Sequence, residues 1–319
     1  MTDAECDLAV RIAAKTVIAR DIHHFELHPV SRADLPPFQP GAHVGIRTPS
    51  GALRRYSLCG DPAERDRYCI AVKREETGRG GSAKMADDTR VGDVLAITPP
   101  RNDFALKGNP ARYIFIAGGI GITPIRAIIL HLMREGGKPF RLYYLARNAD
   151  MMAFREEFEA PQFRGKVVLH HDDGDPTRAF DLWPILEEPK GAHLYCCGPR
   201  GLMQAVRDMT GHWSSAAVHF EDFGTAKAPI EDNRPFRIRL ARRGASLDVP
   251  QDKSILETLR SAGIHVPSSC ESGTCGTCRT GLLSGEADHR DLALSDQERA
   301  RSIMICVSRA RGGELVLDL

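Results

Sequence analysis

Four cysteines in the last fifty residues of the chain have a spacing that suits a metal cluster. They are Cys270, Cys275, Cys278 and Cys306, in the pattern C-x4-C-x2-C followed, after 27 residues, by the last cysteine. Thiolates are the ligands of iron–sulfur clusters, and this spacing is the plant-type [2Fe–2S] pattern. A four-cysteine zinc site is the alternative, but zinc ligands usually form two short C-x2–4-C pairs. The isolated fourth cysteine therefore favours the iron–sulfur cluster.

The loop that holds the first three cysteines is rich in small residues. Gly273 and Gly276 lie within SSCESGTCGTC and allow the backbone to wrap closely. Backbone N–H groups aimed at the sulfur atoms stabilise the reduced, more negative cluster. The loop therefore has the composition that an electron-transfer cluster requires.

Two segments in the first hundred residues have the chemistry of a flavin site. In Arg54-Arg55-Tyr56-Ser57, a tyrosine can cover one face of a ring, serine can bond its polar atoms, and arginine can hold a phosphate. Residues 71–82, AVKREETGRGGS, end in glycines and a serine whose N–H groups can form an anion-binding concavity. A solvated edge strand and a flexible turn are the simpler alternatives. The two segments together favour a flavin phosphate site.

A third segment suits a nicotinamide nucleotide. GGIGITP, residues 118–124, follows a buried strand and precedes a helix, so a pyrophosphate can approach the backbone at a helix N-terminus. A tight strand–helix turn is the alternative. Asp172 and Asp173 end a later strand, where an acidic group bonds ribose hydroxyls and repels a 2′-phosphate. We therefore predict NADH rather than NADPH, although Arg147 at another strand end is suited to bind that phosphate instead.

The order of secondary structure divides the chain into three domains. Short alternating strands up to about residue 100 predict an antiparallel β-barrel. From Tyr113 buried strands alternate with helices, which predicts an α/β domain with a parallel sheet. After a polar, proline-containing linker come a hairpin, a helix over SILETLRSAGI, the cysteine loop and a final strand, ELVLDL. The predicted boundaries are 1–106 for the flavin domain, 107–224 for the nicotinamide domain, 225–233 for the linker and 234–319 for the cluster domain.

The composition of the chain limits the classes of binding partner and the cellular location that we expect. The chain has 319 residues, with 43 Lys and Arg against 42 Asp and Glu, so no whole-chain field favours nucleic acid or an anionic membrane. The most apolar stretch, residues 114–133, contains three glycines, a proline and Arg126 and does not predict a membrane span. The N-terminus lacks the features of a signal peptide. We expect a cytoplasmic monomer in which the five other cysteines are thiols: Cys6, Cys59, Cys69, Cys196 and Cys197.

PSSCESGTCGTC and ICVSRA, together with RLYYLAR, HLYCCGP and GELVLDL, resemble the family of phthalate dioxygenase reductase along essentially the whole chain. The resemblance implies a ferredoxin domain of the β-grasp type, FMN rather than FAD, and an electron route that starts at NADH. Flavin contacts implied in this way are Arg54, Arg55, Tyr56, Ser57, Val72, Lys73, Arg74, Gly80, Gly81 and Ser82. The expected nicotinamide contacts are Gly119, Gly121, Thr123, Pro124, Arg147, Asp173, Cys197, Gly198 and Pro199. The resemblance also implies that Phe223 is stacked near the flavin.

The function that follows from the resemblance is electron delivery from NADH through FMN and the cluster to a Rieske-type terminal oxygenase acting on an aromatic acid, most simply phthalate. Ser57 and Cys197 are the residues expected beside the reacting rings. Reductases of a vanillate-type O-demethylase or a benzoate oxygenase stay open as alternatives. A stand-alone diaphorase has no use for a tethered cluster, and a cluster-based redox sensor calls for a binding element that the sequence does not suggest.

Overall fold

The computed structural model describes residues 6, 8–31, 34–76, 80–223 and 233–319. The chain divides into two compact units, residues 1–202 and 203–319. The expected linker, 225–233, lies outside the described residues except for Asn233. The predicted domain boundaries stay predictions.

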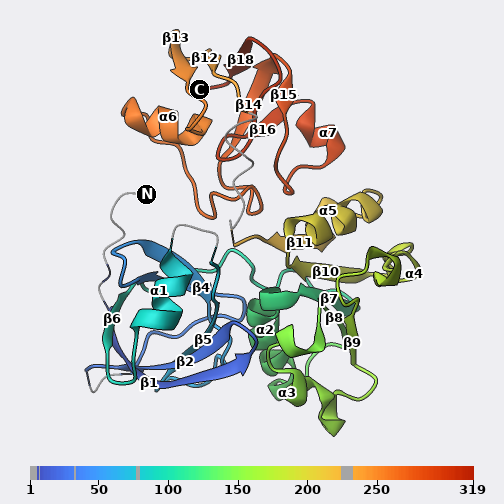
Figure 1. Ribbon diagram of the computed structural model, residues 1–319. Helices are drawn as coiled ribbons and strands as arrows, with labels where there is room; N and C mark the ends of the chain where they lie inside the picture. Colours follow the sequence, from blue (N-terminus) through green and yellow to red (C-terminus); the bar gives the residue numbers. More distant parts are fainter. Residues whose placement is uncertain (1–5, 7, 32–33, 77–79, 224–232) are drawn as a thin grey trace. The chain divides into compact units, whose positions relative to one another are not determined.

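The first unit begins with a six-stranded antiparallel barrel, drawn in blue to cyan in Figure 1. Its strands pair in the order β4-β3-β6-β1-β2-β5. Leu58, which follows β4, pairs with Ile70 of β5, and this bridge joins the two edge strands into a closed sheet. Closure leaves no exposed edge and turns alternate side chains inward. The elements are β1(Leu8–Ala19), β2(Ile22–Pro29), β3(His43–Arg47), β4(Leu53–Ser57), β5(Tyr68–Lys73), α1(Gly81–Asp88) and β6(Val94–Ile97).

The same unit continues with a parallel sheet, drawn in green (Figure 1). Strands β10, β7, β8 and β9 pair in parallel in that order. Strand β7 is almost wholly buried, as expected for a parallel strand covered on both faces. The elements are β7(Arg112–Gly118), η1(Gly119–Gly121), α2(Ile122–Arg134), β8(Phe140–Ala146), η2(Ala149–Met151), α3(Arg155–Glu159), η3(Pro161–Phe163), β9(Val167–His171), η4(Pro176–Arg178), α4(Trp183–Leu186), β10(Ala192–Cys197) and α5(Arg200–Met209), in which the unit ends.

The second unit contains a five-stranded sheet in the order β13-β12-β18-β14-β16, drawn in orange to red (Figure 1). The hairpin β12–β13 is antiparallel, and the final strand β18 pairs with β12 in parallel. This mixed sheet and helix α6 form the predicted α+β cluster domain. The elements are η5(Ser215–Ala217), β11(Val218–Glu221), β12(Phe236–Leu240), β13(Ala245–Val249), α6(Ile255–Ser261), β14(Arg279–Ser284), β15(Ala287–Asp288), α7(Asp296–Arg299), β16(Ser302–Met304), β17(Arg309–Ala310) and β18(Glu314–Leu317).

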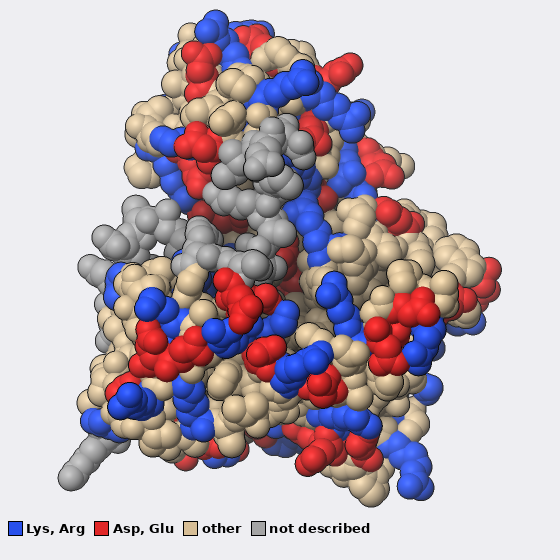
Figure 2. Space-filling view, in the orientation of Figure 1, with Lys and Arg blue, Asp and Glu red and all other residues tan. Residues whose placement is uncertain are grey.

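The three-part fold class is therefore confirmed. The helix predicted over SILETLRSAGI begins at a capping box, in which Ser254 and Glu257 bond each other's backbone N–H groups. Figure 2 shows basic and acidic side chains intermixed over the visible face, in keeping with the near-zero net charge. Among the described residues, no helix has the length and apolar character needed to span a bilayer.

A buried arginine fastens the start of the cluster domain. Arg309 is 4% exposed and donates to the carbonyl oxygens of Lys253 at 2.6 Å, Pro250 at 3.0 Å and Arg234 at 3.1 Å. Its guanidinium also lies 4.9 Å from the ring centroid of Phe236. Removing the side chain leaves three carbonyls without their donor.

We predict that Arg309→Met lowers the free energy of unfolding of the cluster domain by about 2–4 kcal/mol, since hydrogen bonds to charged groups contribute about 1.5–3 kcal/mol each and do not add fully. Denaturant titration followed through the iron–sulfur absorbance measures the change. The control is Arg311→Met, two residues away and exposed, which we expect to stay within about 0.5 kcal/mol of the parent. Equal stability of the two variants contradicts the prediction.

Candidate functional site

Closure of the barrel brings the two flavin segments together. Tyr56 and Ser57 end β4, next to the bridge that joins Leu58 to β5. The Tyr56 hydroxyl and the Ser57 Oγ are buried without a hydrogen-bond partner in the described part of the chain. Burial raises the pKa of Tyr56 to about 12, so the phenol stays neutral at physiological pH. Buried polar groups of this kind require a partner, and the polar edge of a bound flavin ring suits them.

The phosphate end of this site has the predicted glycines at the start of a helix. Gly80 is left-handed (φ 72°) and precedes α1, a helix that the sequence alone did not indicate. A Cβ at Gly81 would lie 2.8 Å from the Arg54 Nε, so the guanidinium lies directly against the first helical turn. The Ser82 Oγ accepts from the Glu75 N–H at 3.2 Å. A guanidinium beside the N-terminus of a helix is a suitable phosphate site.

The basic residues after Val72 are engaged with carboxylates. Val72 is fully buried in β5. Lys73 Nζ lies 2.6 Å from Glu75, and Arg74 bonds both Asp87 at 3.0 Å and Glu76 at 2.9 Å. Arg55 is half-buried in β4. That Arg55, Lys73 and Arg74 contact the flavin stays a prediction.

The two predicted nicotinamide loops pack directly on each other. Gly121 lies so close to the end of β10 that a Cβ there would be 2.1 Å from the Cys197 carbonyl oxygen. Gly118 and Pro199 are similarly close, at 2.6 Å from a Cβ to the proline Cδ. The Thr123 hydroxyl donates to the Ile120 carbonyl at 3.0 Å and so ties α2 to the loop before it. Both loops lie at the carboxyl ends of parallel strands, where ligands bind in open α/β sheets.

The nicotinamide loop also lies against the flavin strand. Within the first unit, η1 is in contact with β5, which carries Val72 and Lys73. Cys197 and Thr123 are buried beside it. The residues predicted for the flavin and for the nicotinamide therefore meet within one compact unit, as direct transfer between the two rings requires.

The predicted ribose carboxylate lies in a small charged cluster. Asp173 is left-handed (φ 55°) and bonds Arg178 at 2.5 Å and His171 Nδ1 at 3.0 Å. The hydrogen bond from Arg178 lowers the pKa of Asp173 from its usual value. Asp172 accepts from the Gly174 N–H, and Arg147 is exposed after β8. The Asp173 carboxylate, the Arg178 guanidinium and the His171 imidazole thus lie close together at the end of β9.

The cysteine loop brings together sulfur atoms and backbone donors. Cys270, Cys278 and Cys306 are buried and Cys275 is half-buried. Hydrogen bonds from Cys275 and then Ser272 lower the pKa of Cys270, and a bond from Cys306 lowers that of Cys278. The N–H groups of Ser272 and Cys275 each lie 3.4 Å from the Cys270 sulfur. Four cysteine sulfur atoms with backbone N–H donors beside them fit the donor set of a [2Fe–2S] cluster.

Arg260 of α6 holds this loop against the helix through an ion pair and a hydrogen bond, which together we call the clamp. Arg260 donates to the Ser268 hydroxyl at 2.5 Å and to Glu271 at 2.6 Å, and both ion-pair partners are 26% exposed. Glu271 adopts a left-handed conformation (φ 54°) directly after Cys270. Gly273 is also left-handed, and a Cβ there would lie 2.7 Å from Val307. The clamp and the close packing together set the curvature of the loop.

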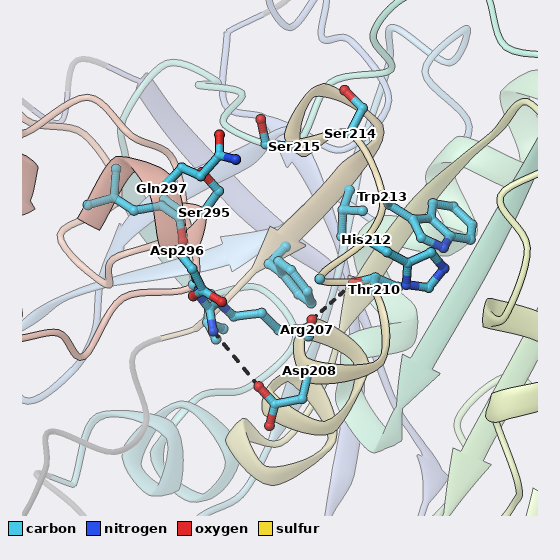
Figure 3. Close-up of a pocket in the computed structure, with 16 residues that line it drawn as sticks. Arg207, Asp208, Thr210, His212, Trp213, Ser214, Ser215, Ser295, Asp296 and Gln297 are labelled. Atoms are coloured by element: carbon cyan, nitrogen blue, oxygen red, sulfur yellow. Dashed lines mark hydrogen bonds and ion pairs between the residues drawn. The ribbon is translucent and has the colours of Figure 1, made fainter. Parts of the chain in front are cut away.

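A cavity of about 750 Å³ lies in the second unit beside the segment that supports the cysteine loop (Figure 3). Arg207 lines it and donates to the Leu294 carbonyl at 3.0 Å and to Asp296 at 3.2 Å. Leu292, in the same segment, donates to the Gly273 carbonyl at 3.0 Å. None of the predicted site residues is among the described residues lining the cavity. Phe223 follows β11 and is half-buried, and its role stays a prediction.

The motifs did not reveal the residues that position the sites. Arg126 and Arg260 lie outside every motif, and the resemblance of ICVSRA assigns no role to its Arg309. Each of the three makes its principal bonds to carbonyl oxygens or to a carboxylate distant in sequence. An arginine inside a helix or strand is ordinarily a solvated residue, so the sequence held no signal for these three.

The comparisons agree with this geometry. Residues 238–311 match the 2Fe-2S iron-sulfur cluster binding domain and residues 115–208 the oxidoreductase NAD-binding domain. Phthalate dioxygenase reductase of Burkholderia cepacia is 53% identical over 98% of this chain and 97% of its own. The phthalate 4,5-dioxygenase oxygenase reductase subunit of Pseudomonas putida is 52% identical over 97% and 96%. The solved structure of a phthalate dioxygenase reductase covers 98% of both chains with a TM-score of 0.71 and 53% identity.

A closed flavin-type barrel, a parallel sheet with a glycine loop and a four-cysteine loop define an iron–sulfur flavoprotein oxidoreductase. The chain belongs to the phthalate dioxygenase reductase family. It is an NADH-dependent oxidoreductase that uses FMN and a [2Fe–2S] cluster, which confirms the predicted family, activity and cofactors and decides against a zinc site.

We predict that Gly121→Ala raises the KM for NADH by about tenfold or more, because the new Cβ forces the two loops apart and separates groups that orient the nicotinamide. Steady-state dye reduction measures KM, and the flavin and cluster spectra report intact cofactors. Gly201→Ala is the control, since a Cβ there meets nothing within 4 Å. An unchanged KM in Gly121→Ala is the contrary result.

Proposed function

We propose that this chain is the reductase component of a phthalate-type dioxygenase and delivers electrons from NADH to a Rieske-type terminal oxygenase. The observation that carries the proposal is the full-length likeness to reductases named for phthalate dioxygenases. The fused order of flavin barrel, nicotinamide sheet and cluster domain supports it. Each part supplies one stage of an internal electron route.

We assign the nucleotide contacts to residues that lie together in the first unit. Tyr56 and Ser57 bind the flavin ring, and Arg54 with residues 80–82 binds its phosphate. Gly121 and Cys197 place the nicotinamide beside the ring, and Asp173 bonds the adenosine ribose. A flavin held by these residues would supply the chemistry that matches a two-electron donor to a one-electron cluster. The residues supply orientation and exclude water, and none of them acts as a nucleophile.

We assign the cluster to Cys270, Cys275, Cys278 and Cys306. From Arg234 onward the chain has thirteen Lys and Arg and eleven Asp and Glu, so this domain lacks a strong acidic field. A cluster tethered to its own flavin needs little long-range attraction, because the tether supplies a high effective concentration. The outward contact with the oxygenase then falls on the loop from Ser268 to Cys278.

The finer expectations belong to the same proposal. A monomer suits a reductase whose exposed loop must dock on a partner, and the domain boundaries at 106, 224 and 233 follow the change from barrel to sheet to cluster domain. None of the nine cysteines, all of which lie in the described residues, forms a disulfide, which is compatible with a cytoplasmic location.

The decisive experiment mixes the purified reductase and NADH with candidate oxygenases and follows product. We expect coupled turnover with a phthalate dioxygenase oxygenase component and much slower turnover with those of vanillate O-demethylase or a benzoate dioxygenase. Faster turnover with either of the latter overturns the phthalate assignment and supports that alternative. Turnover with none of them removes the oxygenase-reductase assignment.

We predict that Cys306→Ser abolishes the [2Fe–2S] absorption and lowers oxygenase-coupled turnover by at least about 100-fold, whereas NADH-dependent dye reduction through the flavin stays within about twofold. Optical titration with NADH separates the two effects. Cys6→Ser, which changes a half-buried cysteine outside the four, is the control and is expected to retain both activities. A Cys306→Ser protein that keeps its cluster spectrum refutes the ligand assignment.

We predict that Asp173→Asn reduces the preference for NADH over NADPH by about tenfold, equivalent to about 1.4 kcal/mol. The substitution removes a negative charge that repels a 2′-phosphate and releases Arg178 from its ion pair. The ratio of kcat/KM for the two donors measures the effect. Glu188→Gln, an exposed carboxylate paired with Lys190, is the matched control. A preference that stays constant in Asp173→Asn contradicts the ribose assignment.

A further inference from the structure

One half-buried arginine joins the flavin barrel to the nicotinamide sheet. Arg126 lies in α2, and its Nη1 donates to the carbonyl oxygen of Cys59, two residues after Ser57. Its Nε donates to Glu157 Oε2 of α3 at 2.8 Å. The Arg126 and Glu157 side chains are 18% and 26% exposed. A single guanidinium thus bonds a barrel carbonyl and a carboxylate of the α/β part, both inside the first unit.

The Arg126 guanidinium also stacks on an aromatic ring. It lies 4.5 Å from the ring centroid of Phe154, which is left-handed (φ 59°) immediately before α3. The same ring meets His24 of β2 edge-on, with centroids 5.8 Å apart. Barrel and sheet residues therefore surround Arg126, and its planar fork has little freedom to reorient.

The two residues joined by the Arg126–Cys59 hydrogen bond lie close in sequence to the nicotinamide loop and to the flavin segment. Arg126 is one turn from Ile122, where α2 emerges from the nicotinamide loop, and Cys59 follows the flavin segment of β4. The Cys59 N–H donates to the Cys69 carbonyl at 2.8 Å, so this position is also fixed to the start of β5. If Arg126 shifts relative to Cys59, the nicotinamide loop therefore shifts relative to β4 and β5.

We propose that Arg126 is a positioning residue that sets the approach of the nicotinamide loop to the flavin site. The inference rests on the nucleotide assignments proposed above and adds a residue that touches neither ring. Displacement of reacting groups by about 1 Å costs on the order of 100-fold in rate. Lysine cannot replace arginine here, because a compact ammonium cannot bond both acceptors and stack on Phe154 at once.

The same helix supplies a matched control. Arg134, two turns further along α2, bonds Asp61 at 2.6 Å and so contacts the same barrel loop as Arg126. Its side chain is 36% exposed, and it lies at the end of the helix away from the nicotinamide loop. A purely structural role for such contacts predicts similar behaviour of the two arginines, whereas a positioning role confines the effect to Arg126.

The experiment compares Arg126→Gln, Arg126→Lys and Arg134→Gln as full-length, cofactor-loaded proteins without oxygenase. Stopped-flow mixing with NADH gives the rate constant for flavin bleaching and, from its concentration dependence, the NADH Kd. The long-wavelength absorption on binding NAD⁺ to the reduced protein reports stacking of nicotinamide on flavin. Thermal unfolding of Arg126→Gln, Glu157→Gln and the double variant measures the coupling of the pair separately from activity.

We expect Arg126→Gln to slow flavin reduction by about 10- to 100-fold with an NADH Kd within about threefold of the parent, and to weaken the long-wavelength band. Arg126→Lys should keep less than about a third of the parent rate, and Arg134→Gln should stay within about twofold. A parent-like rate and band in flavin-loaded Arg126→Gln overturn the inference, as does an equal loss in Arg134→Gln. If Arg126→Gln does not retain FMN, Arg126→Lys decides by the same criteria. Failure of the parent to support any oxygenase bears only on the proposed function.

Discussion

The pairing of Leu58 with Ile70 is the contact from which the flavin site follows. It converts an antiparallel sheet into a barrel and so places the end of β4 beside β5, two segments that are distant in the sheet order. The Tyr56 hydroxyl and the Ser57 Oγ become buried as a consequence, and neither atom has a hydrogen-bond partner in the described part of the chain. Cys59, two residues after Ser57, then presents its carbonyl to Arg126 of the α/β part. Barrel closure thus determines both where the predicted flavin residues lie and the point at which the nicotinamide sheet attaches.

In the nicotinamide site, close backbone packing plays the part that barrel closure plays in the flavin site. Gly121 approaches the Cys197 carbonyl more closely than any side-chain carbon permits, so the two loops behave as one surface. This surface lies at the carboxyl ends of parallel strands, where helix α2 also begins. An orienting site of this kind depends on the absence of side chains, which explains why glycines rather than charged residues dominate its motif.

Much of this was predictable from the sequence, because patterns that act locally leave local signals. Alternating strands, buried parallel strands and the spacing of Cys270 and its partners each predicted an element or a ligand set. Helix α1 was not predicted, since GRGGS suits a turn as well as a helix start. The arginines that hold the sites together were also missed. Arg126 bonds a carbonyl 67 positions away, and a carbonyl belongs to every residue type, so no pairing pattern identifies it.

The two arginines beside the sites illustrate a division of labour within the chain. Residues expected to meet a cofactor are constrained by its chemistry and therefore form recognisable motifs, such as the four-cysteine pattern. Residues that hold one motif against another are constrained only by the distance to be bridged and by the need to satisfy buried acceptors. Arg260 bridges α6 to the cysteine loop through Glu271, and Arg126 bridges α2 to the loop after β4. Arginine suits both places because its fixed fork bonds two acceptors in a defined geometry. Electron transfer depends steeply on such geometry, so residues outside every motif contribute to the rate as well as those within them.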